Sequence, residues 1–441
     1  MQRRSFHQII AAAAWLGAGG CTLAASSPSS ARLLRPQRTV HWKDFLGVNA
    51  HLLWFTPDQY QQQLQSWKDL GLEWLRVDLH WDRLEPEAQQ YRLSELDALV
   101  QVLKAKQLKS VFYLVGSAPF ATTAPRASKT PDQYPPREPE VFAERMVLLA
   151  RRYPSINAWQ VWNEPNLPSF WRPWAHPEQY GKLLQASVRA LRQAVPGKTV
   201  VMGGMAYYSQ MPGRGGLMLE TLGKMGVVKL DTVVAYHPYS LHPEGDVPRD
   251  SDFVLRAQQL NRTLRTAGVR RIWATEWGWS SYAGPKEEQE IIGEHGQADY
   301  LLRRLALMSA LDFDRVFLFA LSDLDGRATV RDRSYGLLDL QGQPKPVYMA
   351  LQRFLQITGP ALTPAELPAM EGVTHDLHAI AWQREDGRQL LMFWGARAGQ
   401  LRFPGLLQAV LHQPLDGSQR EWHDEKGLQL PVLPSLQILI W

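Results

Sequence analysis

The sequence predicts an α/β protein, with an eight-stranded (β/α)8 TIM barrel followed by a small C-terminal β-sandwich. Eight short apolar runs, rich in Val, Ile, Leu and aromatic residues, alternate with longer amphipathic segments between residues 45 and 321. Strands that are buried on both faces read as continuous apolar runs, so these runs predict a parallel sheet. A barrel of this kind typically takes about 250 residues before insertions, which fits this region.

The elements can be assigned in order from the pattern. The predicted strands lie at 45–49, 74–79, 110–115, 158–162, 200–205, 232–236, 272–275 and 316–321. The predicted helices lie at 57–70, 94–106, 138–151, 177–194, 253–267 and 297–311. Ser94 precedes Glu95 and Asp97, a helix start signal, and Gly71 and Gly268 fall where helix C-caps are expected. A doubly wound open sheet is the alternative, but no glycine-rich phosphate loop follows any of the strands.

The two ends of the chain differ from this middle region. Short predicted strands at 377–383, 389–394, 408–412 and 436–441 lie between Asp-Gly and Pro turns. They predict a β-sandwich over residues 360–441, joined by a strand from about 31–42, beside a barrel over 40–355. These strands lack a row of exposed aromatic residues, so we expect the sandwich to support the barrel rather than to bind carbohydrate.

Residues 1–30 are expected to be an export leader and not part of the fold. Arg3 and Arg4 precede an apolar run over residues 9–18, and small residues follow that run. This order is typical of a secretory signal, and the paired arginines before Phe6 resemble a twin-arginine export signal. The prediction is an exported, periplasmic protein. Cleavage of the leader, its retention as an inner-membrane anchor, and lipidation of Cys21 are three alternatives.

The composition and charge of the chain limit the partners and cofactors that we expect it to bind. The chain has 441 residues and a formal net charge of +5, with its basic residues scattered along the sequence. Nucleic-acid binding needs a clustered basic face, so we expect no nucleic-acid partner. Cys21 is the single cysteine, which rules out an internal disulfide framework, and the histidines lack metal-ligand spacing. We therefore predict a monomer with no metal and no cofactor. The 17 tryptophans fit both core positions and stacking platforms for sugar rings.

Two of the predicted strands end at a glutamate. Glu164 follows the fourth strand, between Asn163 and Pro165, and Glu276 ends the seventh. In a barrel, the carboxyl ends of the strands form one mouth, so three strand–helix units place these glutamates across it. Hydrolysis of a glycosidic bond with retention needs two carboxyl groups about 5–5.5 Å apart. The two glutamates therefore predict a glycosidase, with a raised pKa for Glu164 against apolar neighbours and a low pKa for Glu276.

Further residues at the predicted mouth are candidates for substrate contact. Asn163 is suited to bond the sugar hydroxyl next to the reacting carbon. Tyr239 is suited to keep Glu276 ionised by donating a hydrogen bond, and His237 to orient substrate or to tune Glu164. The strand-end residues Asn49, His80 and Trp81 and the stacking candidates Trp171 and Trp277 complete the predicted set. Weaker stacking candidates are Trp54, Phe55, Phe170, Trp174, Trp279 and Tyr282.

The motif around Glu164, Trp-Asn-Glu-Pro-Asn, together with Glu-Trp-Gly at Glu276, resembles the retaining glycoside hydrolase clan with (β/α)8 barrels. The overall sequence resembles family 39 of that clan most, in particular its members associated with bacterial exopolysaccharide. The stretches 42–49, 79–84, 322–325, 335–339 and 344–348 also carry the resemblance, which runs from about residue 40 to residue 441. It implies that Glu164 is the acid/base and Glu276 the nucleophile. The leader and His51, which replaces an amide residue, depart from the family pattern.

The resemblance implies an endo-acting β-glycosidase of the cell envelope, which hydrolyses a secreted, mannose-rich polysaccharide and contacts the export machinery. The alternative function is a non-catalytic glycan-binding or export-assembly component that has kept the barrel. A protein that only binds glycan has no need of two catalytic glutamates, so Glu164 and Glu276 favour the enzyme.

Overall fold

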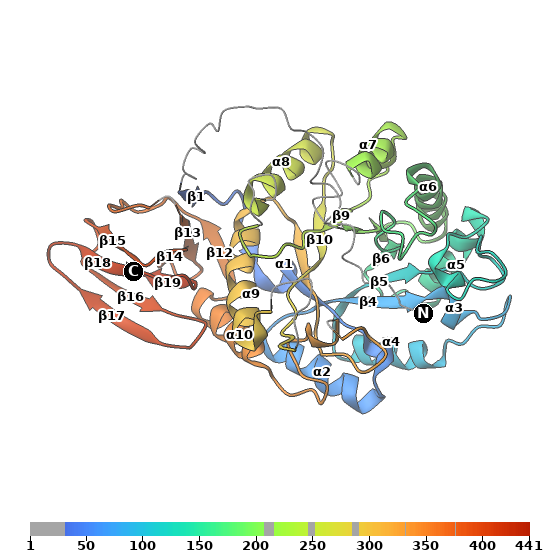
Figure 1. Cartoon of the computed structure of the whole chain (residues 1–441), viewed down its shortest axis with the longest axis horizontal. Coiled ribbons are helices and arrows are strands. Elements are labelled where there is room, and N and C mark those ends of the chain that lie inside the picture. Colours follow the sequence, from blue (N-terminus) through green and yellow to red (C-terminus); the bar gives the residue numbers. More distant parts are fainter. Residues whose placement is uncertain (1–30, 207–215, 246–251, 285–290, 331, 375) are drawn as a thin grey trace.

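The computed structural model of the chain describes residues 31–206, 216–245, 252–284, 291–330, 332–374 and 376–441. The predicted leader, with Cys21, lies outside the described residues. The described chain forms an elongated molecule, with a parallel sheet among helices over most of its length and antiparallel strands at one end (Figure 1). No helix in the described ranges is long and apolar enough to cross a membrane.

The parallel sheet is curled, and its two edge strands follow one another in the sequence. Its strand order is β7-β6-β5-β4-β3-β11-β10-β9-β8, and every pair is parallel. The strands are β3 (Leu46–Asn49), β4 (Trp74–His80), β5 (Lys109–Val115), β6 (Ala158–Val161), β7 (Thr199–Met202), β8 (Met205–Ala206), β9 (Val234–His237), β10 (Ile272–Trp277) and β11 (Arg315–Leu318). A parallel bridge from Val201 to Val233 draws β7 toward β9. This arrangement is consistent with a TIM-like (β/α)8 fold, in which β7 and β8 together form the fifth strand.

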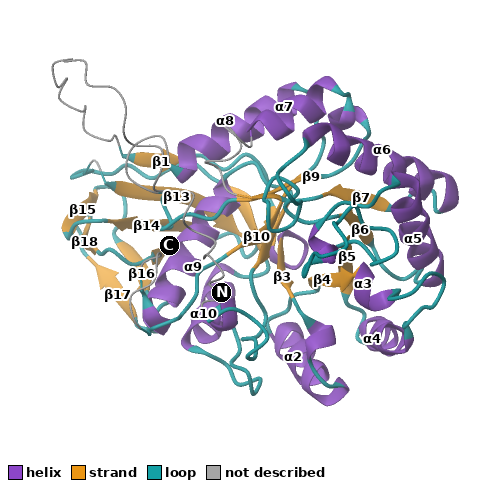
Figure 2. Cartoon of the chain, turned by 45° about the vertical axis from the view of Figure 1, so that its right-hand side comes forward, coloured by secondary structure: helices purple, strands orange, loops and turns teal. Residues whose placement is uncertain are grey.

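Helices alternate with these strands and lie around the sheet (Figure 2). They are α1 (Trp42–Phe45), α2 (Pro57–Asp69), α3 (Trp81–Leu84), α4 (Ser94–Ala105), α5 (Pro139–Arg152), α6 (Pro177–Ala194), α7 (Gly216–Lys224), α8 (Phe253–Thr266), α9 (Gly293–Ala310) and α10 (Pro346–Thr358). Local signals explain several starts: Thr56 and Gln59 form a capping box at α2, and Asp252 caps α8. Gly71 and Gly268 adopt positive φ just after α2 and α8, as their C-cap assignment predicts.

The C-terminal region is antiparallel except for one strand pair, as expected for a β-sandwich. Its main sheet has the order β17-β16-β19-β14-β13-β12-β2, β1 pairs with β13 in parallel, and β15 pairs with β18 in a second sheet. The strands are β1 (Arg32–Leu34), β2 (Val40–His41), β12 (Ala361–Pro364), β13 (Leu377–Arg384), β14 (Gln389–Gly395), β15 (Gly399–Phe403), β16 (Gln408–His412), β17 (Gln419–His423), β18 (Leu428–Val432) and β19 (Gln437–Ile440). The sequence pattern alone did not identify β12, β15, β17 and β18, whose runs are short or polar.

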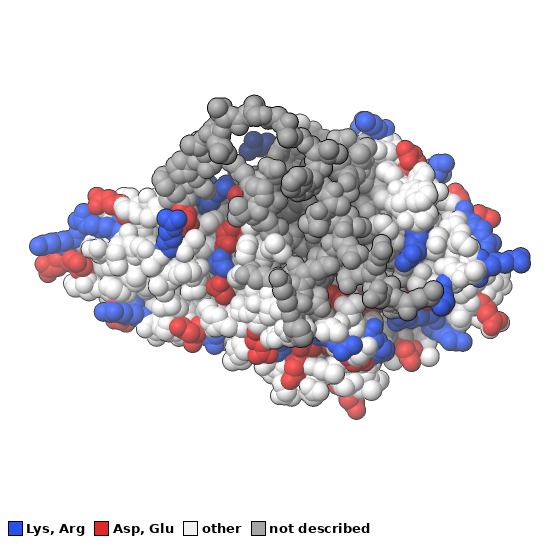
Figure 3. Space-filling model, viewed as in Figure 1, with Lys and Arg blue, Asp and Glu red and all other residues white. Residues whose placement is uncertain are grey.

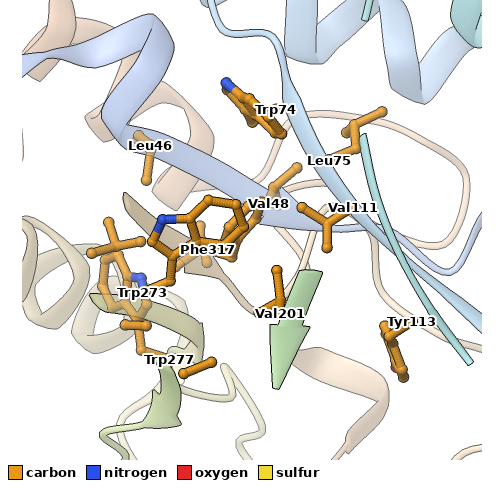
Figure 4. Close-up of a cluster of buried hydrophobic side chains, with 14 of the residues drawn as sticks. Leu46, Val48, Trp74, Leu75, Val111, Tyr113, Val201, Trp273, Trp277 and Phe317 are labelled. Atoms are coloured by element: carbon orange, nitrogen blue, oxygen red, sulfur yellow. The ribbon is translucent and has the colours of Figure 1, made fainter. Parts of the chain in front are cut away.

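Alternate side chains of β13 and β14 face opposite sides of the antiparallel sheet and show how it packs against the barrel-like region. Trp382, Met392 and Trp394 belong to the large core that fills the parallel sheet and its helices. Leu391 and Phe393, on the opposite face, belong to a separate core with β15 and β18. One face of the antiparallel sheet therefore packs on the barrel-like region and the other on the second sheet. Part of that large core is a cluster of buried apolar side chains on the strands of the parallel sheet, which includes Trp74, Val111, Trp273 and Phe317 (Figure 4).

Charged residues of both signs are interspersed over the visible part of the described surface (Figure 3). No single-sign stripe runs across the described part of that face, which agrees with the scattered basic residues of the sequence.

Candidate active site

The chain turns sharply where β6 delivers Glu164 to the carboxyl end of the sheet. Trp162 and Glu164 both have positive φ, 72° and 41°, which is unusual for residues other than glycine. The Glu164 amide donates to the carbonyl of Gly204 at 3.1 Å, and Pro165 prevents further strand pairing. Strained backbone of this kind is concentrated at functional sites, where the surrounding structure holds it in place.

Glu276, from β10, lies close to Glu164, and His237 from β9 lies between them. One oxygen of each carboxylate and one ring nitrogen of His237 all lie within 4.8 Å of one another. His237 Nδ1 is 2.8 Å from Glu164 Oε1 and 3.6 Å from Glu276 Oε2. A Cβ atom at position 204 would lie 2.0 Å from His237 Nε2, so the close approach of the ring requires Gly204.

A buried arginine holds the second glutamate. Arg76, in β4, donates from Nη1 to Glu276 Oε1 at 2.6 Å and to Asn49 Oδ1 at 2.7 Å. Its Nη2 donates to Asn163 Oδ1 at 2.7 Å and its Nε to Gln160 Oε1 at 2.6 Å. The guanidinium is fully buried, so these four acceptors compensate for its loss of water.

The two glutamates have pKa values that are shifted in opposite directions. Burial raises the pKa of Glu164, and the charge of Glu276 adds to this, against the opposing effects of His237 and Arg76. Burial also acts to raise the pKa of Glu276, but the charges of His237 and Arg76 and the Arg76 hydrogen bond outweigh it, so that pKa is lowered. The site thus favours a proton on Glu164 and a negative charge on Glu276, which is the division of roles that an acid and a nucleophile need.

Three of the predicted substrate contacts lie beside the glutamates. His237 bonds Glu164, and the Tyr239 hydroxyl donates to Glu276 Oε2 at 3.3 Å. Asn163 accepts from Arg76 through Oδ1, which leaves its amide NH2 as the donor end of the side chain. His80 lies at the end of β4, is partly exposed, and its Nε2 is 3.2 Å from Asp78 Oδ2.

The other predicted contacts bond or pack against the protein itself. Asn49 accepts from Arg76 and donates to the carbonyls of Thr275 and Leu318, so it supports the arginine. Trp81 packs in the core against two phenylalanines and bonds Glu85 through its indole N–H.

The two tryptophans selected as stacking walls are also buried. Trp171 is 1% exposed and packs edge-on against Trp162 and Tyr180, because its loop folds back over α6. Trp277 is fully buried in the apolar cluster of Figure 4. Trp174, one of the weaker candidates, is 66% exposed in the loop after Glu164. Closeness in sequence to Glu164 or Glu276 did not predict which ring faces solvent.

The sequence prediction missed Arg76 and the group around Asp78. The Asp78 carboxylate lies between His80 and His51, whose Nδ1 is 2.9 Å from Asp78 Oδ1. A signal was present: Arg76, Asp78 and His80 alternate along a strand whose other residues are apolar. Side chains two apart in a strand share a face, so this spacing indicates a polar interior at that strand.

Glu164, His237 and Glu276 are also spaced so that they suit a metal ion. Their contacts favour a different use: Arg76 already supplies a positive charge to Glu276, and burial favours the protonated form of Glu164. The absence of a metal stays a prediction of the sequence.

The protein resembles several solved structures of glycoside hydrolases. It is similar to a family 39 glycoside hydrolase from the gut symbiont Bacteroides cellulosilyticus WH2, with a TM-score of 0.72, 19% identity, and coverage of 92% of this chain and 81% of that chain. A GH30 endoxylanase from Clostridium papyrosolvens C71 has a TM-score of 0.60 and 11% identity, with coverage of 94% of this chain and 99% of that chain. The endo-β1,6-glucanase BT3312 has a TM-score of 0.59 and 13% identity, with coverage of 95% of each chain. At these identities the similarity shows the fold alone. No curated protein matches the sequence.

A curled parallel sheet with two buried glutamates at its carboxyl end is the arrangement of a clan A glycoside hydrolase. The chain belongs to the cellulase family, glycosyl hydrolase family 5, whose model matches residues 36–306. The matching family model is therefore that of family 5, while the closer resemblance to family 39 stays a prediction of the sequence motifs.

Proposed function

We propose that the protein is a retaining endo-β-glycosidase that hydrolyses a secreted exopolysaccharide through a covalent glycosyl-enzyme intermediate. The observation that carries this proposal is the pair Glu164 and Glu276, with oxygens within 4.8 Å and pKa values shifted in opposite directions. Retaining enzymes place their carboxyl groups about 5–5.5 Å apart, whereas inverting enzymes need about 6.5–9.5 Å to admit a water molecule.

Each residue then has a role in double displacement. Glu276 attacks the anomeric carbon, and Glu164 gives its proton to the leaving oxygen as the glycosidic bond breaks. In the second step Glu164 takes a proton from water, whose oxygen attacks the same carbon and releases Glu276. Arg76 and Tyr239 hold the attacking carboxylate, and the proposed role of the Asn163 NH2 group is to donate to the hydroxyl beside the reacting carbon.

Stereochemistry tests the mechanism directly. The first anomer released from a β-linked substrate is expected to be β, as observed by proton NMR before mutarotation. Glu276→Gln should lower hydrolysis by orders of magnitude while oligosaccharide binding persists. Release of the α anomer, or unchanged turnover of Glu276→Gln, contradicts the proposal.

An exposed tryptophan supports action on a chain. Trp174 lies in the loop that follows the acid/base Glu164, and the leaving group lies on that side of the site. A tryptophan that is 66% exposed offers a stacking face for a further sugar ring. An endo-acting enzyme should release a range of oligosaccharides early in digestion, and Trp174→Ala should raise KM for long chains more than for aryl glycosides. Release of monosaccharide alone indicates exo action.

The substrate and the location follow from the sequence motifs. The resemblance to family 39 members associated with exopolysaccharide supports a mannose-rich polymer, with the enzyme in the periplasm near the export machinery. The leader is the proposed route of export or anchoring. Digestion of the organism's own exopolysaccharide by purified enzyme tests the substrate, and mass spectrometry of the mature N-terminus tests cleavage of the leader and lipidation of Cys21.

A further inference from the structure

The segment that carries Tyr239 out of β9 is held by donors from neighbouring elements. Arg304, in α9, is fully buried, and Trp279 follows β10. Together they donate to four carbonyl oxygens of residues 238–243 at 2.7–3.0 Å. The guanidinium of Arg304 also lies 3.7 Å from the ring centroid of Phe253. Because its carbonyls are fixed in this way, we expect a displacement at the end of the segment to reach Tyr239.

The end of this segment is bonded to the C-terminal antiparallel sheet. Glu244 Oε1 accepts from the indole N–H of Trp394 at 2.8 Å and from Arg303 Nη1 at 2.5 Å. Trp394 lies in β14 and stacks on His378 of β13, with centroids 5.0 Å apart and planes 4° from parallel. The indole is therefore fixed by its own sheet, and its N–H is directed at a carboxylate of the barrel-like region.

A second connection joins the start of α8 to the same sheet. Asp252, which caps α8, forms an ion pair with Arg32 of β1, and β1 pairs with β13. An antiparallel bridge joins Asp252 to Gly245. The described residues on both sides of the β9–α8 connection are thus attached to the antiparallel sheet.

We propose that the C-terminal sheet is part of the catalytic unit, and that Trp394 and Glu244 are positioning residues that hold Tyr239 against Glu276. This inference rests on the proposed function. The Tyr239–Glu276 hydrogen bond is 3.3 Å long, beyond the usual range for a hydroxyl donor, so a small displacement of the segment weakens it further. Trp394 is buried against the barrel-like region, so its ring is not available to stack on a sugar as in a separate carbohydrate-binding module.

Trp394→Phe tests the inference because it keeps an aromatic ring and removes the N–H donor. Trp382→Phe is the matched control: Trp382 is equally buried in β13, and its indole N–H has no hydrogen-bond partner. Both variants are assayed for kcat/KM against pH with the p-nitrophenyl β-glycoside that the wild type hydrolyses best. Trp394→Phe should lower kcat/KM by about 2- to 10-fold and move the acid limb to higher pH, and Trp382→Phe should leave that limb unchanged.

The acid limb reports Glu276, whose ionisation is affected by Arg76, His237, His51 and Glu164 as well as Tyr239. None of Arg76, His237, His51 and Glu164 contacts Trp394. If Trp394 acts by positioning Tyr239, the shift of the acid limb therefore requires Tyr239. In a Tyr239→Phe background, Trp394→Phe should cause no further shift of the limb and little further loss of kcat/KM.

A wild-type acid limb in Trp394→Phe, or an effect that adds in full to that of Tyr239→Phe, overturns the inference. If Trp394→Phe unfolds at the assay temperature, Glu244→Ala removes the same bond from the other side and should produce the same shift. A wild type without glycosidase turnover overturns the proposed function and this inference with it. An active wild type with an insensitive Trp394→Phe variant overturns this inference alone.

Discussion

Replacing Arg76 with lysine should separate the charge of the active site from its hydrogen bonds. Arg76 is buried and serves four acceptors, on Gln160, Asn49, Glu276 and Asn163. Lysine keeps the positive charge, but it places three donors on a compact ammonium group in place of a planar fork. The variant should therefore fold and keep the positive charge beside Glu276, while losing part of the hydrogen-bond geometry that the guanidinium provides.

The magnitude follows from counting partners. Three donors cannot satisfy four acceptors, so at least one buried acceptor loses its bond, which costs about 1–3 kcal/mol. We expect the free energy of unfolding to fall by about that amount. If the same contact is lost in the transition state for attack by Glu276, kcat/KM falls by about 5- to 150-fold.

The pH dependence gives the sharper measurement. Glu276 must be ionised to attack, and Arg76 is among the groups that lower its pKa, so a weaker contact raises that pKa and moves the acid limb of kcat/KM to higher pH. A carboxylate with a lowered pKa stabilises the fold above its unfolded pKa, and this stabilisation is lost as pH falls through the folded pKa. The stability difference between wild type and Arg76→Lys should thus be largest near neutral pH and shrink in acid.

Arg145→Lys is the control for replacing a partly buried arginine that bonds a buried carboxylate. Arg145 forms two bonds with the buried Glu85 and bonds neither Glu164 nor Glu276. It should lower stability, as measured by urea unfolding, without moving the acid limb. If Arg76→Lys has the wild-type acid limb and urea midpoint, the role assigned to Arg76 is wrong.

Four further changes have definite expected outcomes. Tyr239→Phe should lower kcat by about 10-fold and raise the acid-limb pKa, since Glu276 loses a donor; an unchanged pH profile refutes the contact. Glu164→Gln should raise the melting temperature near neutral pH, where the buried Glu164 is ionised at a cost to the fold, and should lose this advantage in acid, where Glu164 is protonated. Equal melting temperatures of wild type and variant at both pH values refute the raised pKa. Gly204→Ala should displace His237, lower the free energy of unfolding by about 1–3 kcal/mol or more, and remove most of the activity. The control Gly223→Ala, where a Cβ meets nothing within 4 Å, should lower neither by much. Dialysis against EDTA should leave turnover unchanged, and loss of activity that Zn²⁺ or Ca²⁺ restores contradicts a metal-free site.

Strand ends were predictable from the sequence because their polar residues interrupt apolar runs. Each of the eight predicted runs contains strand residues of the parallel sheet, and Glu164 and Glu276 come together at its carboxyl end, with oxygens within 4.8 Å of each other. The reason is geometric: parallel strands deliver their carboxyl ends to one edge, so position along a strand is enough to place a side chain at the mouth.

The direction of a side chain and its distant partners were not predictable in the same way. Trp171 and Trp277 are close in sequence to the glutamates, yet packing turned both rings into the core. Trp394 and Glu244 are 150 positions apart, and neither residue type alone indicates a contact between the two regions. Such contacts depend on the docking of one sheet against another, which a local pattern does not contain.

The two glutamates differ in their direct contact with one buried cation, Arg76. Both carboxylates are buried, and both lie within 3.6 Å of His237 Nδ1, so neither burial nor the histidine separates their roles. Of the two glutamates, only Glu276 accepts a hydrogen bond from Arg76. A buried carboxylate without such a donor retains the effect of desolvation, which favours its protonated form. Arg76 in β4 therefore adds to the charge of His237 in keeping Glu276 ionised, whereas burial favours the proton on Glu164, and the direction of the proposed reaction follows from this difference.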